Sequence, residues 1–245
     1  MAGSVGNITT DITREGLIFN MDAANRGSIS PSSTVAINTI NPAISGTFEN
    51  TTAYDTSLIV PTFDFDGIDD SINCGNNFNI GDSGTDTPLS CVSWIYPVGA
   101  STFPIISRSG THGNSAQREF YLTLNSSRRI EVWFYKVSSS NYIGRSRTGA
   151  LNQNEWHCVG FTYDGSKASS GVTLYLNGVA QSATGYDVSY TGMSNVAPAF
   201  RIGGYTFLEN LNSNGNIGSI QLYNRALLAS EMLHNYNALK GRFGL

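Results

Sequence analysis

Residues 156–165 read Trp-His-Cys-Val-Gly-Phe-Thr-Tyr-Asp-Gly, and residues 174–178 read Leu-Tyr-Leu-Asn-Gly. Both segments are rich in aromatic and aliphatic residues, and they end in Asp-Gly or Asn-Gly. These dipeptides favour tight turns between antiparallel strands. The two segments therefore predict neighbouring strands of an antiparallel sheet.

Similar signals extend in both directions along the 245-residue chain. We predict further strands near residues 16–22, 63–66, 71–74, 89–96, 105–108, 118–124, 129–137, 142–148, 200–203 and 217–223. A helical pattern is found at the end of the chain, where Met232, Leu233, Tyr236 and Leu239 fall on one helical face and Glu231 can bond back to the helix start. The sequence predicts an all-β sandwich of two antiparallel sheets with one short C-terminal helix near residues 229–240.

Five segments carry a resemblance to a known family: Gly16-Leu-Ile-Phe-Asn-Met-Asp22, Phe63-Asp-Phe-Asp-Gly-Ile-Asp-Asp70, residues 156–165, residues 174–178 and Ile217-Gly-Ser-Ile-Gln-Leu-Tyr-Asn-Arg-Ala226. Together they resemble the laminin-G-like and pentraxin-like branch of the concanavalin-A-like lectin/glucanase superfamily. The resemblance implies a jelly-roll domain over residues 15–245, preceded by an N-terminal tail at residues 1–14. The ending Gly241-Arg-Phe-Gly-Leu245 resembles those of tailed-bacteriophage structural proteins that carry such a domain.

Composition narrows the class of protein. The sequence has no run of about 18 apolar residues, so it predicts no membrane-spanning helix. No signal peptide is visible at the N-terminus. Cys74, Cys91 and Cys158 are odd in number and widely spaced, so we expect buried thiols rather than disulfides or metal ligands. These features fit a chain that folds in a reducing cytoplasm, and with the family resemblance they predict a final location on a virion surface.

The sequence predicts neither catalysis nor a cofactor. Glycan-cleaving relatives of the resembled fold carry two acids two positions apart on one strand, whereas none of the seven glutamates here is followed by an acid at that spacing. The three histidines (His112, His157 and His234) show no metal-ligand spacing, and His157 is interpreted as structural. Relatives often hold calcium at the rim of the sandwich. Asp66, Asp69 and Asp70 match the family's Asp-Gly-x-Asp-Asp turn, which by itself explains them, and Ile217-Gly-Ser replaces the acids that relatives carry on the last strand. We therefore predict no metal.

The middle strands supply a candidate glycan site. In the predicted hairpin around residues 125–128, apolar residues at 120, 122, 124, 130, 132 and 134 must face the core. The outward face then carries Glu119, Tyr121 and Thr123 beside Arg129, Glu131, Trp133 and Tyr135. If Asn125 opposes Arg129, Tyr121 lies across from Trp133 and Thr123 from Glu131. We expect the third strand to add Arg145 and Arg147 beside Trp133 and Glu131. The predicted carbohydrate-binding residues are Tyr121, Arg129, Glu131, Trp133, Tyr135 and Arg145.

Charge suggests the kind of ligand. Residues 88–163 hold seven basic and three acidic residues, although the net charge of the whole chain is −4. This local excess favours an acidic polysaccharide, while nucleic acid and membrane are not expected partners. Three hypotheses remain open. The chain is a non-catalytic lectin-like module on a viral fibre or capsid, a virion structural protein that contacts copies of itself or other virion proteins without sugar, or a glycan-processing enzyme. Ordinary cross-strand packing is the alternative explanation of the aromatic ladder.

Overall fold

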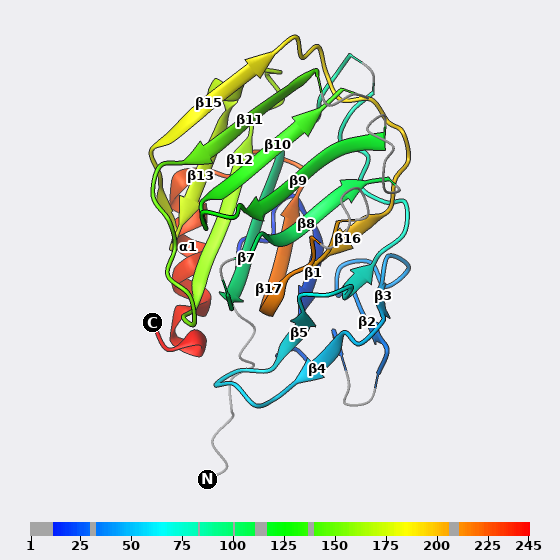
Figure 1. Cartoon of the computed structure of the whole chain (residues 1–245), viewed down its shortest axis with the longest axis vertical. Helices are drawn as coiled ribbons and strands as arrows, with labels where there is room; N and C mark the ends of the chain where they lie inside the picture. Colours follow the sequence, from blue (N-terminus) through cyan, green and yellow to red (C-terminus); the bar gives the residue numbers. More distant parts are fainter. Residues whose placement is uncertain are drawn as a thin grey trace.

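The computed structural model describes residues 12–29, 33–82, 84–99, 101–110, 117–136, 140–205 and 211–245. The strands form two antiparallel sheets, of eight and nine strands, that lie one over the other (Figure 1). One α-helix follows the last strand, as Figure 1 shows in red. The predicted fold class, a β-sandwich of two antiparallel sheets with a C-terminal helix, is confirmed.

The eight-stranded sheet contains β1 (Leu17–Asp22), β4 (Ala53–Asp55), β5 (Thr62–Asp66), β7 (Leu89–Pro97), β12 (His157–Tyr163), β13 (Val172–Leu176), β14 (Val179–Ala180) and β17 (Asn214–Tyr223). The nine-stranded sheet has the spatial order β15 (Ala183–Val188), β11 (Tyr142–Arg147), β10 (Ile130–Tyr135), β9 (Arg118–Leu124), β8 (Phe103–Ser109), β16 (Phe200–Ile202), β6 (Ser71–Asn73), β3 (Gly46–Glu49) and β2 (Val35–Ala36). A 3₁₀ turn, η2 (Ser169–Gly171), precedes β13. The helix α1 (Ala229–Leu239) runs into a second 3₁₀ turn, η3 (Lys240–Phe243).

The main core lies between the two sheets. Its side chains come from alternate positions of each strand, because successive residues of a strand point to opposite faces. Phe120, Leu122 and Phe134 of the nine-stranded sheet meet Phe161 and Leu174 of the other, and all are fully buried. Burying each such side chain stabilises the fold by about 1.5–3 kcal/mol, so this parity fixes which face of β9 and β10 remains outside.

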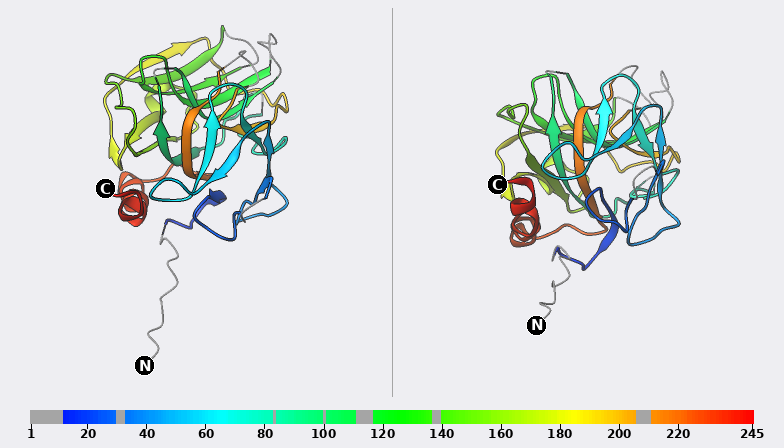
Figure 2. Two further views of the ribbon diagram at one scale, coloured as in Figure 1. Left: turned by 60° about the horizontal axis from the view of Figure 1, so that its bottom comes forward. Right: turned by 90° about the horizontal axis from the view of Figure 1, so that it is seen from below.

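A second apolar layer covers the outer face of the eight-stranded sheet. Trp94 of β7 is fully buried there, stacked between the rings of Tyr236 and Phe243 with centroid distances of 5.7 and 4.2 Å. Figure 2 shows α1 in red on the same side of the molecule as β1 in blue. The end of the chain therefore covers one sheet, while the residues that the structure describes place no helix over the outer face of the other sheet.

The helix begins as expected, and three of the four apolar positions of the predicted face pack against the eight-stranded sheet. The carboxylate of Glu231 accepts a hydrogen bond from the backbone N–H of Leu228 at 2.8 Å, which is half of a capping box. The expected apolar Leu233 is 42% exposed, whereas the polar Asn235 is buried. Asn235 is held there by hydrogen bonds from the Thr13 N–H at 2.8 Å and to the Tyr223 hydroxyl at 3.0 Å.

The first residues that the structure describes contact the C-terminal helix. Residues 1–11 of the predicted tail lie outside the described residues. Ile12 is 7% exposed and packs in the apolar layer under α1, and Thr13 bonds to the helix. Ile12 and Thr13, at the end of the predicted tail, therefore contact the domain.

The Asp66-Gly67 turn does not close a hairpin. It joins β5 of one sheet to β6 of the other, so it carries the chain across the sandwich. Gly67 has a φ of +79°, a conformation that glycine adopts at no steric cost.

Candidate functional site

The outer face of the nine-stranded sheet holds the predicted ladder. Trp133 pairs with Tyr121 and Glu131 with Thr123, and the N–H of Asn125 donates to the Arg129 carbonyl at 3.0 Å. The predicted register of β9 and β10 is therefore confirmed. Trp133 and Tyr121 are half-buried on this outer side.

Arg145 does not join the ladder. In the register of β10 and β11, Trp133 pairs with Gly144 and Val132 with Arg145. Because Val132 faces the core, Arg145 lies on the inner side of the sheet, where its guanidinium donates to the carbonyls of Ser169 at 3.0 Å and Ala183 at 3.3 Å. The predicted register of this third strand is wrong by one residue, and Arg147 shares the inner side with Arg145.

Glu119 is also displaced from the predicted face. The pairing of β8 and β9 shifts between Arg108 and Ser109, which is a β-bulge or similar irregularity. The carboxylate of Glu119 turns toward the interior and forms a buried ion pair with Arg108. Arg118 lies on the outer face instead, with its guanidinium 5.4 Å from the ring centroid of Tyr135.

Six aromatic side chains gather on the outer face, and we call them the aromatic face. They are Tyr121, Trp133, Tyr135, Tyr142, Tyr186 and Tyr205. The Trp133 ring lies 5.3 Å from that of Tyr142 and 5.1 Å from that of Tyr186. The Tyr121 ring lies 4.8 Å from that of Tyr205, which comes from the segment after β16. The face is thus continuous from β15 across to β9.

Two predicted residues have different exposures on this face. Tyr135 is 6% exposed, and its hydroxyl is 3.0 Å from that of Tyr121. Burial raises the pKa of both tyrosines, so their hydroxyls stay protonated and can donate hydrogen bonds. Arg129 is exposed at the end of the β9–β10 hairpin.

Sequence reasoning missed Tyr142, Tyr186 and Tyr205. Tyr142 has the same parity as Ser146, so the correct register of β11 would have placed it on the ladder. Tyr186 lies on β15, and residues 183–188 were not among the predicted strands. Tyr205 follows Gly203 and Gly204 and lies outside any strand, so no periodicity points to it.

Glu131 is fixed at the centre of the face by three donors. Its Oε1 accepts hydrogen bonds from the amide of Asn125 at 2.7 Å and the hydroxyl of Ser146 at 2.8 Å. Its Oε2 accepts one from the indole N–H of Trp133 at 3.1 Å. The carboxylate therefore holds the Trp133 ring in place, and its neighbours across the strands, Thr123 and Ser146, are not acids.

A cavity of about 180 Å³ opens beside Glu131. Tyr121, Thr123 and Glu131 form its floor on β9 and β10, and Tyr205 and Leu211 stand against it from the loop between β16 and β17. The remaining lining residues are Thr102, Ser109, Arg118, Asn125 and Ser126. Aromatic walls with a few polar groups are typical of a site for a small organic ligand.

Gly144 gives Trp133 the room it occupies. A methyl group at position 144 would lie 2.3 Å from Cε3 of the Trp133 ring, far inside contact distance. Replacing Gly144 with alanine is therefore expected to displace the ring, lower the free energy of unfolding by about 1–3 kcal/mol and change the near-ultraviolet circular dichroism of the indole. The control is Gly241→Ala, because a methyl group there meets nothing within 4 Å. An unchanged Trp133 spectrum in Gly144→Ala would show that the ring does not lie on β11.

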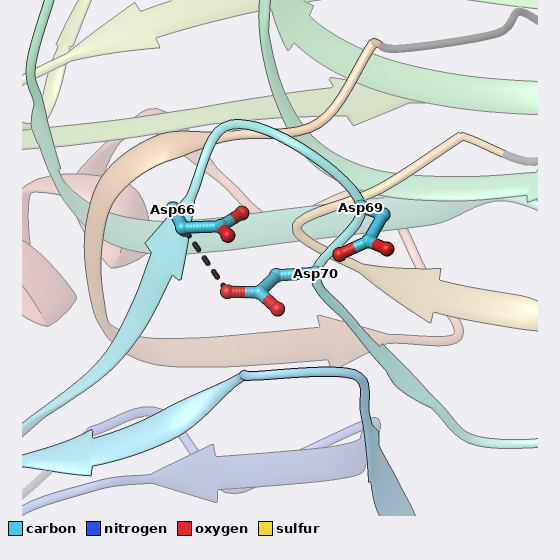
Figure 3. A group of neighbouring side chains, drawn as sticks. All are labelled: Asp66, Asp69 and Asp70. Carbon is cyan, nitrogen blue, oxygen red and sulfur yellow. Dashed lines mark hydrogen bonds between the residues drawn. The ribbon is translucent and has the colours of Figure 1, made fainter.

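Three carboxylates also cluster at the β5–β6 turn. Oxygen atoms of Asp66, Asp69 and Asp70 lie within 4.8 Å of one another (Figure 3). The oxygens of Asp70 accept hydrogen bonds from the Asp66 N–H at 3.0 Å and from the N–H and hydroxyl of Thr51 at 2.8 and 2.9 Å. An Asp66 oxygen accepts one from the Ile68 N–H at 2.8 Å. These bonds account for Asp66 and Asp70 as parts of the turn.

The other predicted special residues have structural surroundings. All three cysteines are buried and free, as expected, and burial raises the pKa of the Cys74 thiol to about 12. His157 is 5% exposed, its Nε2 lies 3.0 Å from the Asn152 carbonyl, and burial lowers its pKa. His112 lies outside the described residues. No helix in the described part of the chain is long and apolar enough to cross a membrane.

Several solved structures share this fold. Domain 4 of the arabinanase AbnA from Geobacillus stearothermophilus, in complex with arabinotriose, is 14% identical with a TM-score of 0.60, covering 91% of this chain and all of that one. The binding domain of Paraclostridial Mosquitocidal Protein 1 is 13% identical with a TM-score of 0.66, covering 91% and 52%. The Trypanosoma rangeli sialidase in complex with sialic acid is 15% identical with a TM-score of 0.63, covering 94% and 34%. The chain thus spans about a third of that sialidase and half of that toxin domain.

No curated protein sequence is significantly similar to this chain. A family model, in contrast, matches residues 66–232, a stretch that runs from the end of β5 to α1 and includes the whole aromatic face. Its description is "Concanavalin A-like lectin/glucanases superfamily". With the two-sheet sandwich in place, this match shows that the chain belongs to the concanavalin A-like lectin/glucanases superfamily.

Proposed function

We propose that the protein is a non-catalytic carbohydrate-binding module and that its aromatic face holds the glycan. The observation that carries this proposal is Trp133, a half-buried ring on an outer sheet face, whose indole N–H bonds to Glu131, a residue that lines a cavity of about 180 Å³. Sugars bind proteins by placing a C–H face on an aromatic ring while charged and amide groups take the hydroxyls. AbnA domain 4, matched over its full length, is a fold relative solved with an oligosaccharide, which supports the same use here.

The non-catalytic part of the proposal rests on the surroundings of Glu131. Glycosidases of the usual kind need two carboxyl groups on either side of the scissile bond. The residues across from Glu131 are Thr123 and Ser146, and the next outward residue along β10 is Trp133. The described part of this face therefore supplies Glu131 with no adjacent second acid, and we interpret it as a binding residue.

Replacing Trp133 with alanine is expected to weaken glycan binding by about 1–3 kcal/mol, roughly 5- to 150-fold, by analogy with the stacking of bases on aromatic side chains. Because the ring also packs on Tyr142 and Tyr186, we expect a modest loss of stability without unfolding. The measurement is calorimetric titration with the best ligand from a glycan array, beside the melting temperature.

Trp156→Phe is the matched control, because Trp156 lies in the apolar layer on the opposite side of the sandwich. Equal loss of binding in both variants would refute the assignment of the site. Release of reducing ends by the native protein that disappears in Glu131→Gln would refute the absence of catalysis.

A second candidate function is a virion structural role. It is favoured by β15, an edge strand on which Tyr186, beside Trp133, and Val188, which pairs with Tyr142, are each 39% exposed. On this hypothesis the aromatic face is covered by another copy of the chain or by another virion protein. Native mass measurement distinguishes the two candidate functions, because Trp133→Ala would dissociate an oligomer only if the aromatic face is a subunit interface. The location on a viral fibre or capsid is carried by the sequence resemblance, and immunogold labelling of virions would test it.

A further inference from the structure

The basic residues of the middle strands are mostly directed away from the aromatic face. Arg145 and Arg147 lie on the inner side of β11, and Arg108 is buried against Glu119. Arg118 lines the cavity, and Arg129 is exposed at the hairpin. The charge excess that predicted an acidic glycan is thus not concentrated at the site.

Glu131 keeps an unused acceptor toward the cavity. An ionised carboxylate has about four lone-pair positions and no donor. Oε1 already accepts two hydrogen bonds, from Asn125 and Ser146, while Oε2 accepts one, from Trp133. Oε2 can accept one more, and Glu131 lines the cavity. A hydrogen-bond donor such as a ligand hydroxyl can satisfy that position, whereas a second acceptor cannot.

Tyr205 supplies the complementary group. Its side chain is 9% exposed and lines the same cavity, and its buried hydroxyl, close to Thr123, makes no hydrogen bond of normal geometry within the described residues. Burial raises its pKa, so the hydroxyl remains a donor. A buried polar group without a partner is costly, and a ligand hydroxyl would satisfy it.

The size of the cavity sets the size of the ligand group. A volume of about 180 Å³ corresponds to roughly six waters at ~30 Å³ each, which is the scale of a single sugar residue. Trp133, which bonds to the cavity residue Glu131, forms a platform with Tyr142 and Tyr186. The site can therefore take one residue in the cavity and its neighbour on the platform.

We propose that Glu131 is the specificity-determining residue of this site, and that the cavity takes one uncharged sugar residue and disfavours acidic ones. The proposal rests on the glycan-binding function given above. A sugar hydroxyl donates to Oε2 of Glu131 and another accepts from Tyr205. An anionic group about 4 Å from Glu131 is repelled by at least ~1 kcal/mol, which corresponds to about fivefold in affinity.

The test compares matched neutral and acidic sugars. The probes are arabinotriose, β-1,4-mannotriose and β-1,4-trimannuronate, the last two differing in a hydroxymethyl or a carboxylate group at C6, within a wider array of neutral glycans and their uronate or sulfated counterparts. We expect the native protein to bind neutral members at least fivefold more tightly, with little dependence on salt. Glu131→Gln should weaken neutral binding about tenfold and bring the two classes closer together. Glu131→Asp, which keeps the charge, should weaken binding but keep the preference.

The controls separate the two proposals. Glu155→Gln removes a carboxylate whose side chain is 50% exposed beside His157 and should change nothing. Melting temperatures and Trp133 fluorescence show whether each variant is folded. Binding that depends on Trp133 but prefers acidic glycans, or that is unaffected by Glu131→Gln, would overturn the role of Glu131 alone. The absence of any binding that depends on Trp133 would overturn both proposals.

Discussion

Replacing Arg108 with methionine is expected to lower the free energy of unfolding by about 3–5 kcal/mol, because it leaves the Glu119 carboxylate buried without its partner. Both side chains of this ion pair are essentially inaccessible to solvent, at 0% and 1% exposure. Arg108 also donates to the amide oxygens of Asn76 and Asn79, each at 2.6 Å, so the loop after β6 loses its attachment as well. For a chain of this size the melting temperature should fall by roughly 10 °C.

The pH dependence of this variant gives a sharper test. Burial raises the pKa of Glu119 in the native protein, and Arg108 opposes that rise. Without Arg108 the pKa rises further above its unfolded value, so the folded state binds the proton more readily. Stability is then greater below the unfolded pKa and is lost as the pH rises through the folded pKa. The difference in unfolding free energy between native and variant proteins should therefore shrink from pH 7 toward pH 4.5.

A double variant provides the control. Arg108→Met with Glu119→Leu removes both charges, and replacing a buried pair by apolar groups is often nearly neutral. We expect it to recover most of the lost stability in urea denaturation. The double variant also loses the 2.7 Å hydrogen bond from the Val196 N–H to the Glu119 carboxylate, and this loss limits the recovery of stability. A single variant as stable as the native protein at pH 7 would mean that this pair is not buried.

Replacing Trp94 with alanine should lower the free energy of unfolding by about 3–5 kcal/mol. The Trp94 ring is fully buried between Tyr236 and Phe243, so its removal leaves a cavity between β7 and the end of the chain. The loss should appear in denaturant unfolding and as faster amide hydrogen exchange in α1. Exchange in β9 and β10, on the other sheet, should change much less.

Trp94→Phe is the matched control. It keeps a ring in the stack and removes an indole N–H that has no hydrogen-bond partner within the described residues. The phenylalanine variant should therefore lose less than half as much stability as the alanine variant. Equal exchange rates of α1 in the native protein and Trp94→Ala would contradict the idea that this stack holds the helix.

Much of the fold and part of the site follow from local sequence rules. Period-2 alternation placed Trp133 and Tyr121 opposite each other because the apolar residues at 120, 122, 132 and 134 have only one favourable side, the core. The same rule failed at Glu119, because a one-residue irregularity in the pairing of β8 and β9 leaves no mark in hydrophobicity. The position of Glu119 is decided by Arg108, which lies 11 residues away in the sequence.

The rest of the site depends on contacts that alternation does not encode. Arg145 was misplaced because the length of the connection between β10 and β11 sets the register, and Ile143 rather than Gly144 fills the core position. Tyr205 reaches the cavity from an irregular segment between two sheets. Fixing Glu131 through Asn125, Ser146 and Trp133 requires side-chain directions that only the folded chain provides.

Both ends of the described chain lie on one side of the molecule, and the aromatic face lies on the other. Thr13 bonds to α1, and Arg242 pairs with Asp22 at 2.9 Å, so both ends of the described chain lie on the outer side of the eight-stranded sheet. The aromatic face is the outer side of the opposite sheet, about 10 Å of packed side chains away. A copy coupled to a bead, a sensor chip or another polypeptide through its C-terminus consequently turns its aromatic face toward the solution. Immobilisation at the C-terminus should therefore leave that face accessible.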